Sequence, residues 1–233
     1  MNATEMKTFI MSHPQLYSEQ LLTAVETNEE KLEYVYNYPF ASKISYSIDL
    51  TEEASADRIP LLLQWDMRWG YHFFGDGPLG CTGCGPTCLS MVAIYLTKNK
   101  LYSPLYVARQ AERMGYYTIG SGTNWSLFSD GCKSFELISA EIPVDYKLIC
   151  EELDNDRPII LSMGKGDFTA TGHLIVITGY ENGNFSVHDP NSIKRSECLW
   201  NYDQIKDQIL HAWSYSRLNS TNSDPVELTY SIS

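Results

Sequence analysis

The chain is poor in positive charge and contains no long apolar run. Its 233 residues include 17 lysines and arginines against 29 aspartates and glutamates, which gives a formal net charge of −12. Nucleic acids and anionic membrane surfaces bind clustered Lys and Arg, so we expect neither as a partner. No stretch reaches the roughly 18 consecutive apolar residues that a transmembrane helix needs, so we expect no membrane span.

The start of the sequence as printed has no signal peptide. Residues 1–7 lack the basic and then apolar pattern of an export signal, which predicts a cytoplasmic protein. With 43% hydrophobic residues, a chain of this length can bury one large core and carry an appendage. We therefore expect a single enzyme-sized core, and we expect the protein to be a monomer.

The six cysteines show no paired spacing of the kind that builds a disulfide scaffold. Cys81, Cys84 and Cys88 cluster, and the other three are scattered. Six reduced thiols favour a reducing or anaerobic setting. A zinc site made of Cys81, Cys84 and either His173 or His188 is an alternative. No second Cys-x-x-Cys or His-x-x-x-His accompanies it, so we expect no metal and no cofactor.

Segment 83–87, Gly-Cys-Gly-Pro-Thr, places a cysteine at the start of an apolar helix. Residues 89–96 are apolar on nearly every face, which is typical of a helix inside a domain. Proline suits the first helical turn, and the unpaired N–H groups there favour an anion such as a thiolate. The motif predicts a nucleophilic Cys84. A structural cysteine in a Gly-Pro turn is the alternative.

Two β-rich runs flank an Asn-Gly pair further along the chain. Residues 172–180 and 184–190 are typical of the two strands of a β-hairpin. We expect a three-residue loop, 181–183, which sets Tyr180 opposite Asn184. A two-residue Asn-Gly loop would shift the register by one residue and turn each affected side chain to the other face of the hairpin.

The expected register brings a histidine and an aspartate to one face. Ile175 then lies opposite Asp189, and His173 is the diagonal neighbour of Asp189, roughly 7–8 Å away. Together with Cys84 upstream, this order suits a thiol nucleophile, an imidazole that carries its proton, and an acid that orients the ring. Taken singly, a core histidine and an Asp-Pro turn are the alternatives. Their conjunction with Cys84 favours catalysis.

Four segments resemble the C39-like cysteine peptidases, which are bacterial relatives of the papain-like fold. They are Ile-Pro-Leu-Leu-Leu-Gln-Trp-Asp at 59–66, Gly-Cys-Gly-Pro-Thr at 83–87, Gly-His-Leu at 172–174 and His-Asp-Pro at 188–190. The resemblance runs over about 59–215, some two thirds of the chain. It implies a hydrolase that acts on peptides or proteins. Family members are often exported or surface-anchored.

The resemblance implies a role for each of four residues. Cys84 is the nucleophile that forms an acyl-thioenzyme, His173 is the base and Asp189 is the orienting acid. Gln64 matches the family's oxyanion-hole glutamine, whose amide would donate to the developing oxyanion beside the Cys84 N–H. Without the resemblance, Gln64 is typical of a surface residue before a turn.

The order of the expected elements indicates an α+β protein with a papain-like cysteine peptidase fold, in which a central helix packs on an antiparallel sheet. We expect an N-terminal helical extension at 1–57, the C39-like peptidase domain at 58–218, and a C-terminal tail or edge strand at 219–233. Within the domain, helices are expected at 104–114, 124–137, 145–153 and 202–210, and strands at 158–163 and 212–217.

The extension carries no expected catalytic residue. Its helices present an apolar stripe that we expect to dock on the peptidase domain: Leu21, Leu22, Val25, Leu32, Val35 and Tyr36. We expect residues 51–57 to be a linker. A propeptide that blocks the cleft is the alternative to a packed extension.

Trp125, among the aromatic residues, and Gly83, beside the thiol, are the expected substrate-binding residues of a groove for an extended peptide. A satellite core is the alternative for the aromatic residues. Two other functions stay open beside the peptidase. One is an acyl or peptidyl transferase that uses the same thiol, and the other is a non-catalytic peptide-binding module.

Overall fold

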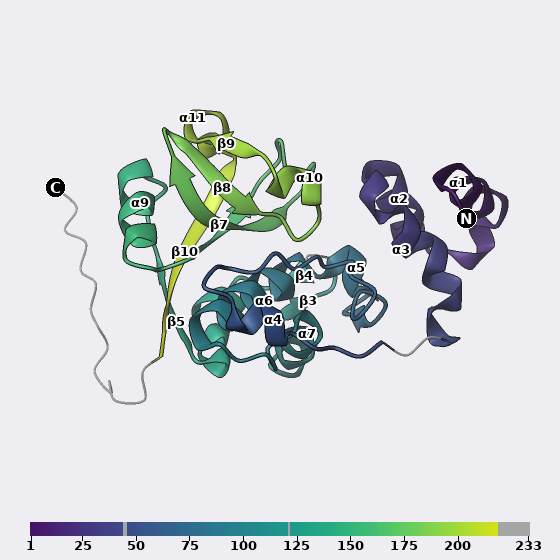
Figure 1. Ribbon diagram of the computed structural model, residues 1–233, viewed down its shortest axis with the longest axis horizontal. Helices are drawn as coiled ribbons and strands as arrows, with labels where there is room; N and C mark the ends of the chain where they lie inside the picture. The colour runs from purple at the N-terminus through teal and green to yellow at the C-terminus, as the bar shows by residue number, and fades with distance from the viewer. Residues whose placement is uncertain (44–45, 121, 219–233) are drawn as a thin grey trace.

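The computed structural model describes residues 1–43, 46–120 and 122–218, and its centre is a six-stranded antiparallel sheet (Figure 1). The strands lie in the order β5, β10, β6, β7, β8, β9. Their bounds are β5 Leu137–Glu141, β6 Ile159–Met163, β7 His173–Glu181, β8 Asn184–His188, β9 Leu199–Asn201 and β10 Ile209–Arg217. Two short ribbons pair β1 (Phe73–Phe74) with β2 (Gly77–Pro78), and β3 (Tyr117–Thr118) with β4 (Gly122–Thr123).

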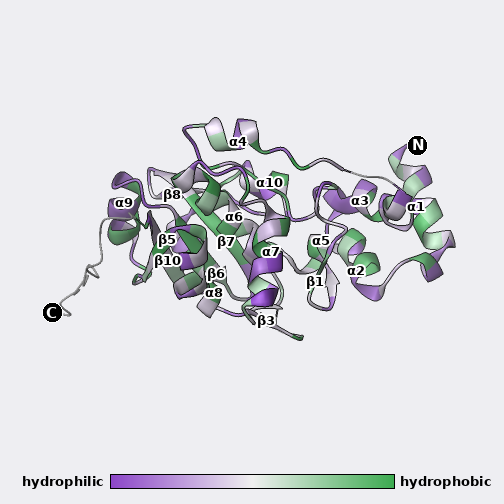
Figure 2. Ribbon diagram, turned by 90° about the horizontal axis from the view of Figure 1, so that it is seen from below, coloured by the Kyte–Doolittle hydropathy of each residue, from purple (hydrophilic) through white to green (hydrophobic). Residues whose placement is uncertain are grey.

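The pleat of the central strands separates two apolar layers. Ile160 and Val176 lie in the layer formed with α6 (Cys84–Thr97), whereas Ile159 and Ile175 lie in the layer formed with α9 (Tyr146–Asp154). Strand β7 is hydrophobic along much of its length (Figure 2), as a strand covered on both faces requires. The expected α+β class, with a central helix on an antiparallel sheet, is confirmed.

Helix α6 is buried almost throughout, in agreement with its continuous apolar run. Pro86 lies in its first turn, and the helix ends before Lys98, which has a left-handed backbone with φ of 57°. Helix α7 (Pro104–Arg113) packs beside α6, and Ser103 caps it by accepting a hydrogen bond from the Tyr106 N–H. The start of α6 therefore lies at the edge of a well-packed apolar layer.

The N-terminal helices form their own apolar cluster beside this layer (Figure 1). Their bounds are α1 Ala3–Ser12, η1 Pro14–Leu16, α2 Glu19–Thr27, η2 Glu29–Lys31, α3 Leu32–Asn37 and η3 Tyr38–Lys43. Leu21, Leu32 and Val35 of the expected stripe are buried, and Leu22, Val25 and Tyr36 are partly buried. The Tyr34 hydroxyl donates to the Gly70 carbonyl at 2.7 Å. The helices thus pack directly on residues that precede Cys84.

Residues 51–57 do not form the linker that the sequence suggests. Residues Thr51–Ser55 form the short helix α4, which packs against α6. Leu50 and Ala54 are buried in the same cluster as α6. The polar and acidic residues of this stretch mark its solvent-facing side, and two apolar side chains are enough to hold it to the core.

Two expected helices are shorter than predicted. Segment 124–137 contains α8 (Ser126–Ser129) and η4 (Gly131–Phe135), and then becomes β5, because Glu136 at φ 60° breaks the helical turns. Segment 202–210 contains α11 (Tyr202–Ile205) and η5 (Lys206–Gln208), and its last residues already belong to β10. In both places a partner strand distant in sequence overrides the local helical pattern.

The expected edge strand or tail at 219–233 lies outside the described residues. Among the helices of the described ranges, none combines the length and the apolar character that a membrane crossing demands.

Candidate functional site

The β7–β8 hairpin reaches the expected register by a different route. Its loop is a two-residue turn in which Asn182 and Gly183 have φ of 48° and 79°, so the expected three-residue loop is wrong. The shift that such a loop causes is cancelled by a bulge at Thr178, between the pairs that Ile177 and Gly179 form with β8. The extra residue lies in the strand and not in the turn.

Beyond the bulge, Val176 pairs with His188, which is the register expected from the three-residue loop. His173 at the start of β7 and Asp189 just past the end of β8 therefore share a face. The Nε2 atom of His173 lies 2.7 Å from Oδ1 of Asp189. The bulge is thus the local feature that forms the His–Asp pair.

Asp189 is completely buried and has several donors around it. Its carboxylate accepts hydrogen bonds from the Arg195 guanidinium and, at 2.7 Å, from the Asn191 N–H, in addition to the imidazole. Burial alone would raise the pKa of Asp189, but His173 and Arg195 keep that pKa below its ordinary value. The buried carboxylate is therefore an anion with a fixed orientation. Arg195, on the short helix α10 (Ile193–Ser196), was not expected from the sequence.

His173 is 9% exposed and lies between a carboxylate and a thiol. Burial lowers its pKa, but the charge and hydrogen bond of Asp189, followed by those of Cys84, raise the pKa to about 9. Since Nε2 bonds Asp189, the Nδ1 atom is the ring nitrogen left for the thiol. At neutral pH the imidazole is therefore predominantly protonated.

Cys84 is the first residue of α6 and is only partly buried. No side chain caps this helix, so its first N–H groups stay available to an anion. Two other thiols lie nearby, but burial raises the pKa of Cys81 and raises that of Cys88 well above its ordinary value. Among these three cysteines, Cys84 is the one paired with an imidazole.

Gln64 is buried beside the same helix start, with 2% of its surface exposed. Its backbone N–H donates to the Pro190 carbonyl at 2.8 Å, next to Asp189. Its side-chain Nε2 donates to the Gly80 carbonyl at 3.1 Å. Within the described residues its Oε1 atom has no hydrogen-bond partner. The amide is consequently held through its nitrogen alone, and that nitrogen has a second N–H to offer.

The two expected substrate-binding residues lie in different surroundings. Trp125 is 44% exposed. Its ring centroid lies 4.1 Å from that of His211, with the two ring planes tilted by 55°, and Trp213 lies further away at 6.3 Å. Gly83 has a packing reason to be glycine, because a Cβ atom there would lie 2.5 Å from the Leu79 carbonyl oxygen. Roles for both residues in substrate binding stay predictions.

For the zinc alternative, the described ranges contain no group of three or more His, Cys, Asp or Glu side chains arranged to hold a metal ion. Cys81 and Cys84 are both free thiols, and the His188 Nδ1 atom lies 3.1 Å from the Pro60 carbonyl oxygen.

Comparison with known proteins matches one family model, and the similar solved structures include two peptidase structures. The model of the Peptidase_C39 like family matches residues 56–221. The peptidase domain of Streptococcus ComA, a bifunctional ABC transporter involved in a quorum-sensing pathway, is 20% identical, with a TM-score of 0.44 over 58% of this chain and 92% of that domain. A putative C39-like peptidase from Bacillus anthracis is 14% identical, with a TM-score of 0.45 over 73% of this chain and 97% of its own. Among curated proteins, none matches the chain significantly.

Proposed function

Because the chain belongs to the Peptidase_C39 like family, we propose that it is a cysteine peptidase that hydrolyses peptide bonds through an acyl-thioenzyme. The observation that carries the proposal is His173, held at 2.7 Å by a buried aspartate and paired on its other side with the Cys84 thiol. A nucleophile, a base and a group that orients the base are the minimum for this chemistry. A peptide-binding module has no need of all three.

Acylation begins when the Cys84 sulfur attacks the peptide carbonyl carbon. A carbon–sulfur bond forms, and the π electrons of the carbonyl move onto its oxygen. The Cys84 N–H and the free N–H of the Gln64 amide would stabilise that oxyanion. The tetrahedral intermediate then collapses, its carbon–nitrogen bond breaks, and the protonated imidazole of His173 gives its proton to the departing amine.

Deacylation repeats the sequence with water. Neutral His173 takes a proton from the water molecule whose oxygen attacks the thioester carbon. Collapse of the second tetrahedral intermediate releases the carboxylic acid and restores the thiolate and imidazolium. Asp189 stays ionised throughout, because it holds the ring orientation and compensates the imidazolium charge.

The proposal is tested with a peptide library and a thiol-directed acyl probe. We expect cleavage of a subset of peptides, inhibition by the probe, and a mass increase on the peptide that contains Cys84. A parallel reaction with a primary amine separates hydrolysis from acyl transfer, because a transferase gives the amide product. Specific binding of peptides without cleavage or transfer, in a protein whose Cys84 the probe does not label, would contradict the proposal.

Replacing Gln64 by alanine tests the oxyanion role. We expect Gln64→Ala to lower kcat by roughly 10²–10³ with little change in KM, because an oxyanion donor acts mainly in the transition state. The measurement is steady-state kinetics on a peptide that the wild type cleaves. A folded variant with wild-type kcat would remove Gln64 from the site and leave the other three residues in place.

The fall of kcat/KM at high pH, the alkaline limb of the pH profile, tests the His173–Asp189 pair. In the wild type we expect kcat/KM to fall as the pH rises through about 9, because His173 then loses its proton. Asp189→Asn removes the carboxylate that raises the pKa of His173, whereas burial, which lowers it, remains. The limb should therefore move to lower pH, by about one unit or more.

A matched control for this shift is Glu141→Gln. This substitution removes the carboxylate from the more exposed Glu141–His211 pair. We expect the pH profile of the control to overlay that of the wild type. An alkaline limb that stays near pH 9 in Asp189→Asn would show that His173 does not control it.

A further inference from the structure

A lysine from the N-terminal extension enters the interior of the molecule beside the candidate site. Lys31, at the end of η2, is 4% exposed, and its Nζ atom donates to the Gly80 carbonyl at 2.9 Å. This is the carbonyl to which the Gln64 amide donates. A carbonyl oxygen has two lone pairs, so these two donors complete its hydrogen bonding.

The charge on Lys31 has no ion-pair partner in the described part of the chain. Its ammonium forms none of the ion pairs found there, although Asp189 and the thiols of Cys81 and Cys84 lie near enough to act on its charge. Burial lowers the pKa of Lys31, which reflects the cost of keeping a cation away from water. A buried cation that forms no salt bridge requires a reason at the group it binds.

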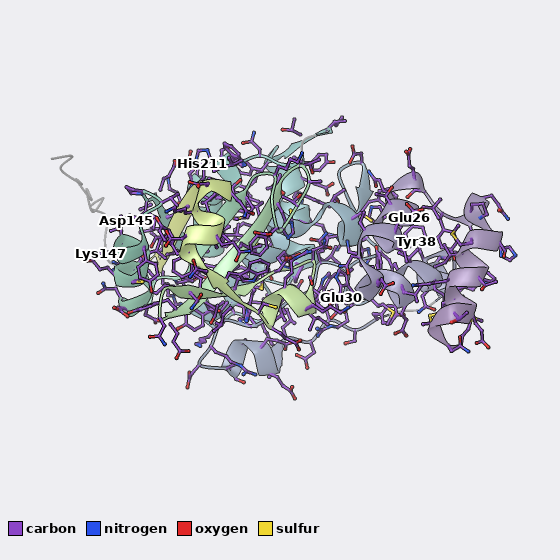
Figure 3. All side chains as sticks on the ribbon, turned by 90° about the horizontal axis from the view of Figure 1, so that it is seen from above. Glu26, Glu30, Tyr38, Asp145, Lys147 and His211 are labelled. Carbon is purple, nitrogen blue, oxygen red and sulfur yellow. The ribbon has the colours of Figure 1, made fainter. Side chains whose placement is uncertain are left out.

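The neighbouring residues fix the segment that carries Lys31. The Glu30 carboxylate accepts hydrogen bonds from the Ser192 hydroxyl and, at 2.8 Å, from the Ile193 N–H, and it lies beside α10 (Figure 3). The Asn28 amide donates to the Asn191 carbonyl. Segment 28–31 is thus bonded both to the loop that follows Asp189 and to the turn that precedes Cys84.

The Gly80 carbonyl lies where the chain changes from one helix to the next. Gly83 separates helix α5 (Leu79–Thr82) from helix α6. In a continuous helix the Cys84 N–H would donate to the Gly80 carbonyl. The carbonyl accepts from Lys31 and Gln64 instead. Gly80 also permits the close approach of the extension, since a Cβ atom would lie 2.4 Å from the Tyr34 ring.

We propose that Lys31 is a positioning residue of the active site: it holds the Gly80 carbonyl and through it the Gln64 amide that faces the oxyanion. The Oε1 atom of Gln64 has no partner among the described residues. The hydrogen bond from Nε2 to the Gly80 carbonyl is therefore the interaction that fixes the orientation of the amide group. An amide rotated by 180° would place two oxygens together. The extension then completes the site and does not act as a detachable inhibitor. The inference rests on the peptidase function proposed above.

The test is a double-mutant cycle in kcat. Lys31→Met keeps the length of the side chain and removes its donor, and we expect kcat to fall about 10-fold with KM unchanged, the size of one hydrogen bond to a charged group. Because Lys31 acts through Gln64, the double variant Lys31→Met/Gln64→Ala should lie within about threefold of Gln64→Ala. If the loss of kcat in the double variant equalled the product of the losses in the two single variants, the inference would be overturned. A wild-type kcat in Lys31→Met would overturn it too.

The matched control is Lys7→Met, the same substitution at an exposed lysine of the extension that pairs with Glu29. We expect wild-type kinetics from it. Circular dichroism and urea unfolding establish that each variant is folded. Removing an unpaired buried charge also removes its desolvation cost, and the Gly80 carbonyl keeps the Gln64 donor, so we expect Lys31→Met to fold.

Affinity for a peptide aldehyde gives a reading that does not depend on turnover. The Cys84 sulfur adds to the aldehyde carbon, the carbonyl π bond breaks, and the oxygen, which takes a proton from His173, occupies the oxyanion position. We expect Lys31→Met and Gln64→Ala to bind the aldehyde more weakly, by factors that do not multiply in the double variant. Equal affinity in all variants would overturn the role of Lys31. A wild type that neither cleaves peptides nor binds the aldehyde would contradict the proposed function itself.

Discussion

Cys84→Ala is expected to lose peptide cleavage by roughly 10⁴–10⁶-fold, to the level left by binding and the oxyanion donors alone. In the proposed mechanism no other group forms the acyl intermediate, since His173 and Asp189 both act on the Cys84 thiol. The substitution removes one partly buried sulfur atom, so the free energy of unfolding should change little. Steady-state kinetics and urea unfolding on the same preparation measure both effects.

The control for Cys84→Ala is Cys81→Ala, which removes the thiol three residues earlier. Burial raises the pKa of Cys81, so its thiol stays protonated at neutral pH and is a poor nucleophile. We expect Cys81→Ala to keep its activity and Cys84 to remain the thiol that an alkylating reagent labels first. Full activity in Cys84→Ala would contradict the assignment of Cys84 as the nucleophile. Loss of activity only in Cys81→Ala would contradict it as well.

His173→Gln should be nearly as damaging as loss of the thiol. The variant has no group that takes the proton of the attacking thiol or water and none that protonates the departing amine. Glutamine keeps a donor that can reach Asp189, which limits the cost of leaving a buried carboxylate unpaired. The measurement is kcat on the best peptide. A His173→Gln protein with full activity would refute the whole proposed mechanism.

The same variant should change how stability depends on pH. The pKa of His173 is raised to about 9 from its ordinary 6.5, so protonation stabilises the folded protein fully below pH 6.5, and this contribution is lost as the pH rises through 9. The difference corresponds to about 3 kcal/mol. Urea unfolding at pH 6 and pH 9 should show this loss in the wild type. His173→Gln should lack it.

The sequence predicts the centre of the molecule well and its periphery poorly. The apolar run of α6 predicts a helix that is covered on all sides, and the Gly-Cys-Gly-Pro pattern indicates where the helix starts. Residues 137–141 carry too few apolar side chains to be recognised as a strand, and they become one only because β10 offers hydrogen bonds. Residues 51–57 look like a linker because Ala54 and the preceding Leu50 are too weak an apolar pattern to indicate a packed helix.

The candidate site divides in the same way. The hairpin pattern predicts that His173 and Asp189 share a face, but no residue type indicates the bulge at Thr178, which depends on the twist and packing of the whole sheet. Gln64 is found only by the family resemblance. Lys31 gives no signal, because a lysine between two glutamates and a leucine is typical of a solvated helix start. The roles of these residues, and the division of the chain near residue 57, stay predictions.

The hydrogen bonds that Asn28 and Glu30 form with the loop after Asp189 have a consequence for how the protein folds during its synthesis. Asn28 and its partner Asn191 are 163 residues apart, so segment 28–31 can reach its final position only after the β7–β8 hairpin has been synthesised. Contacts of such long range form late in folding, after the local helices. We therefore expect the candidate site to assemble only after β8 and α10 have left the ribosome, in a single late step of folding.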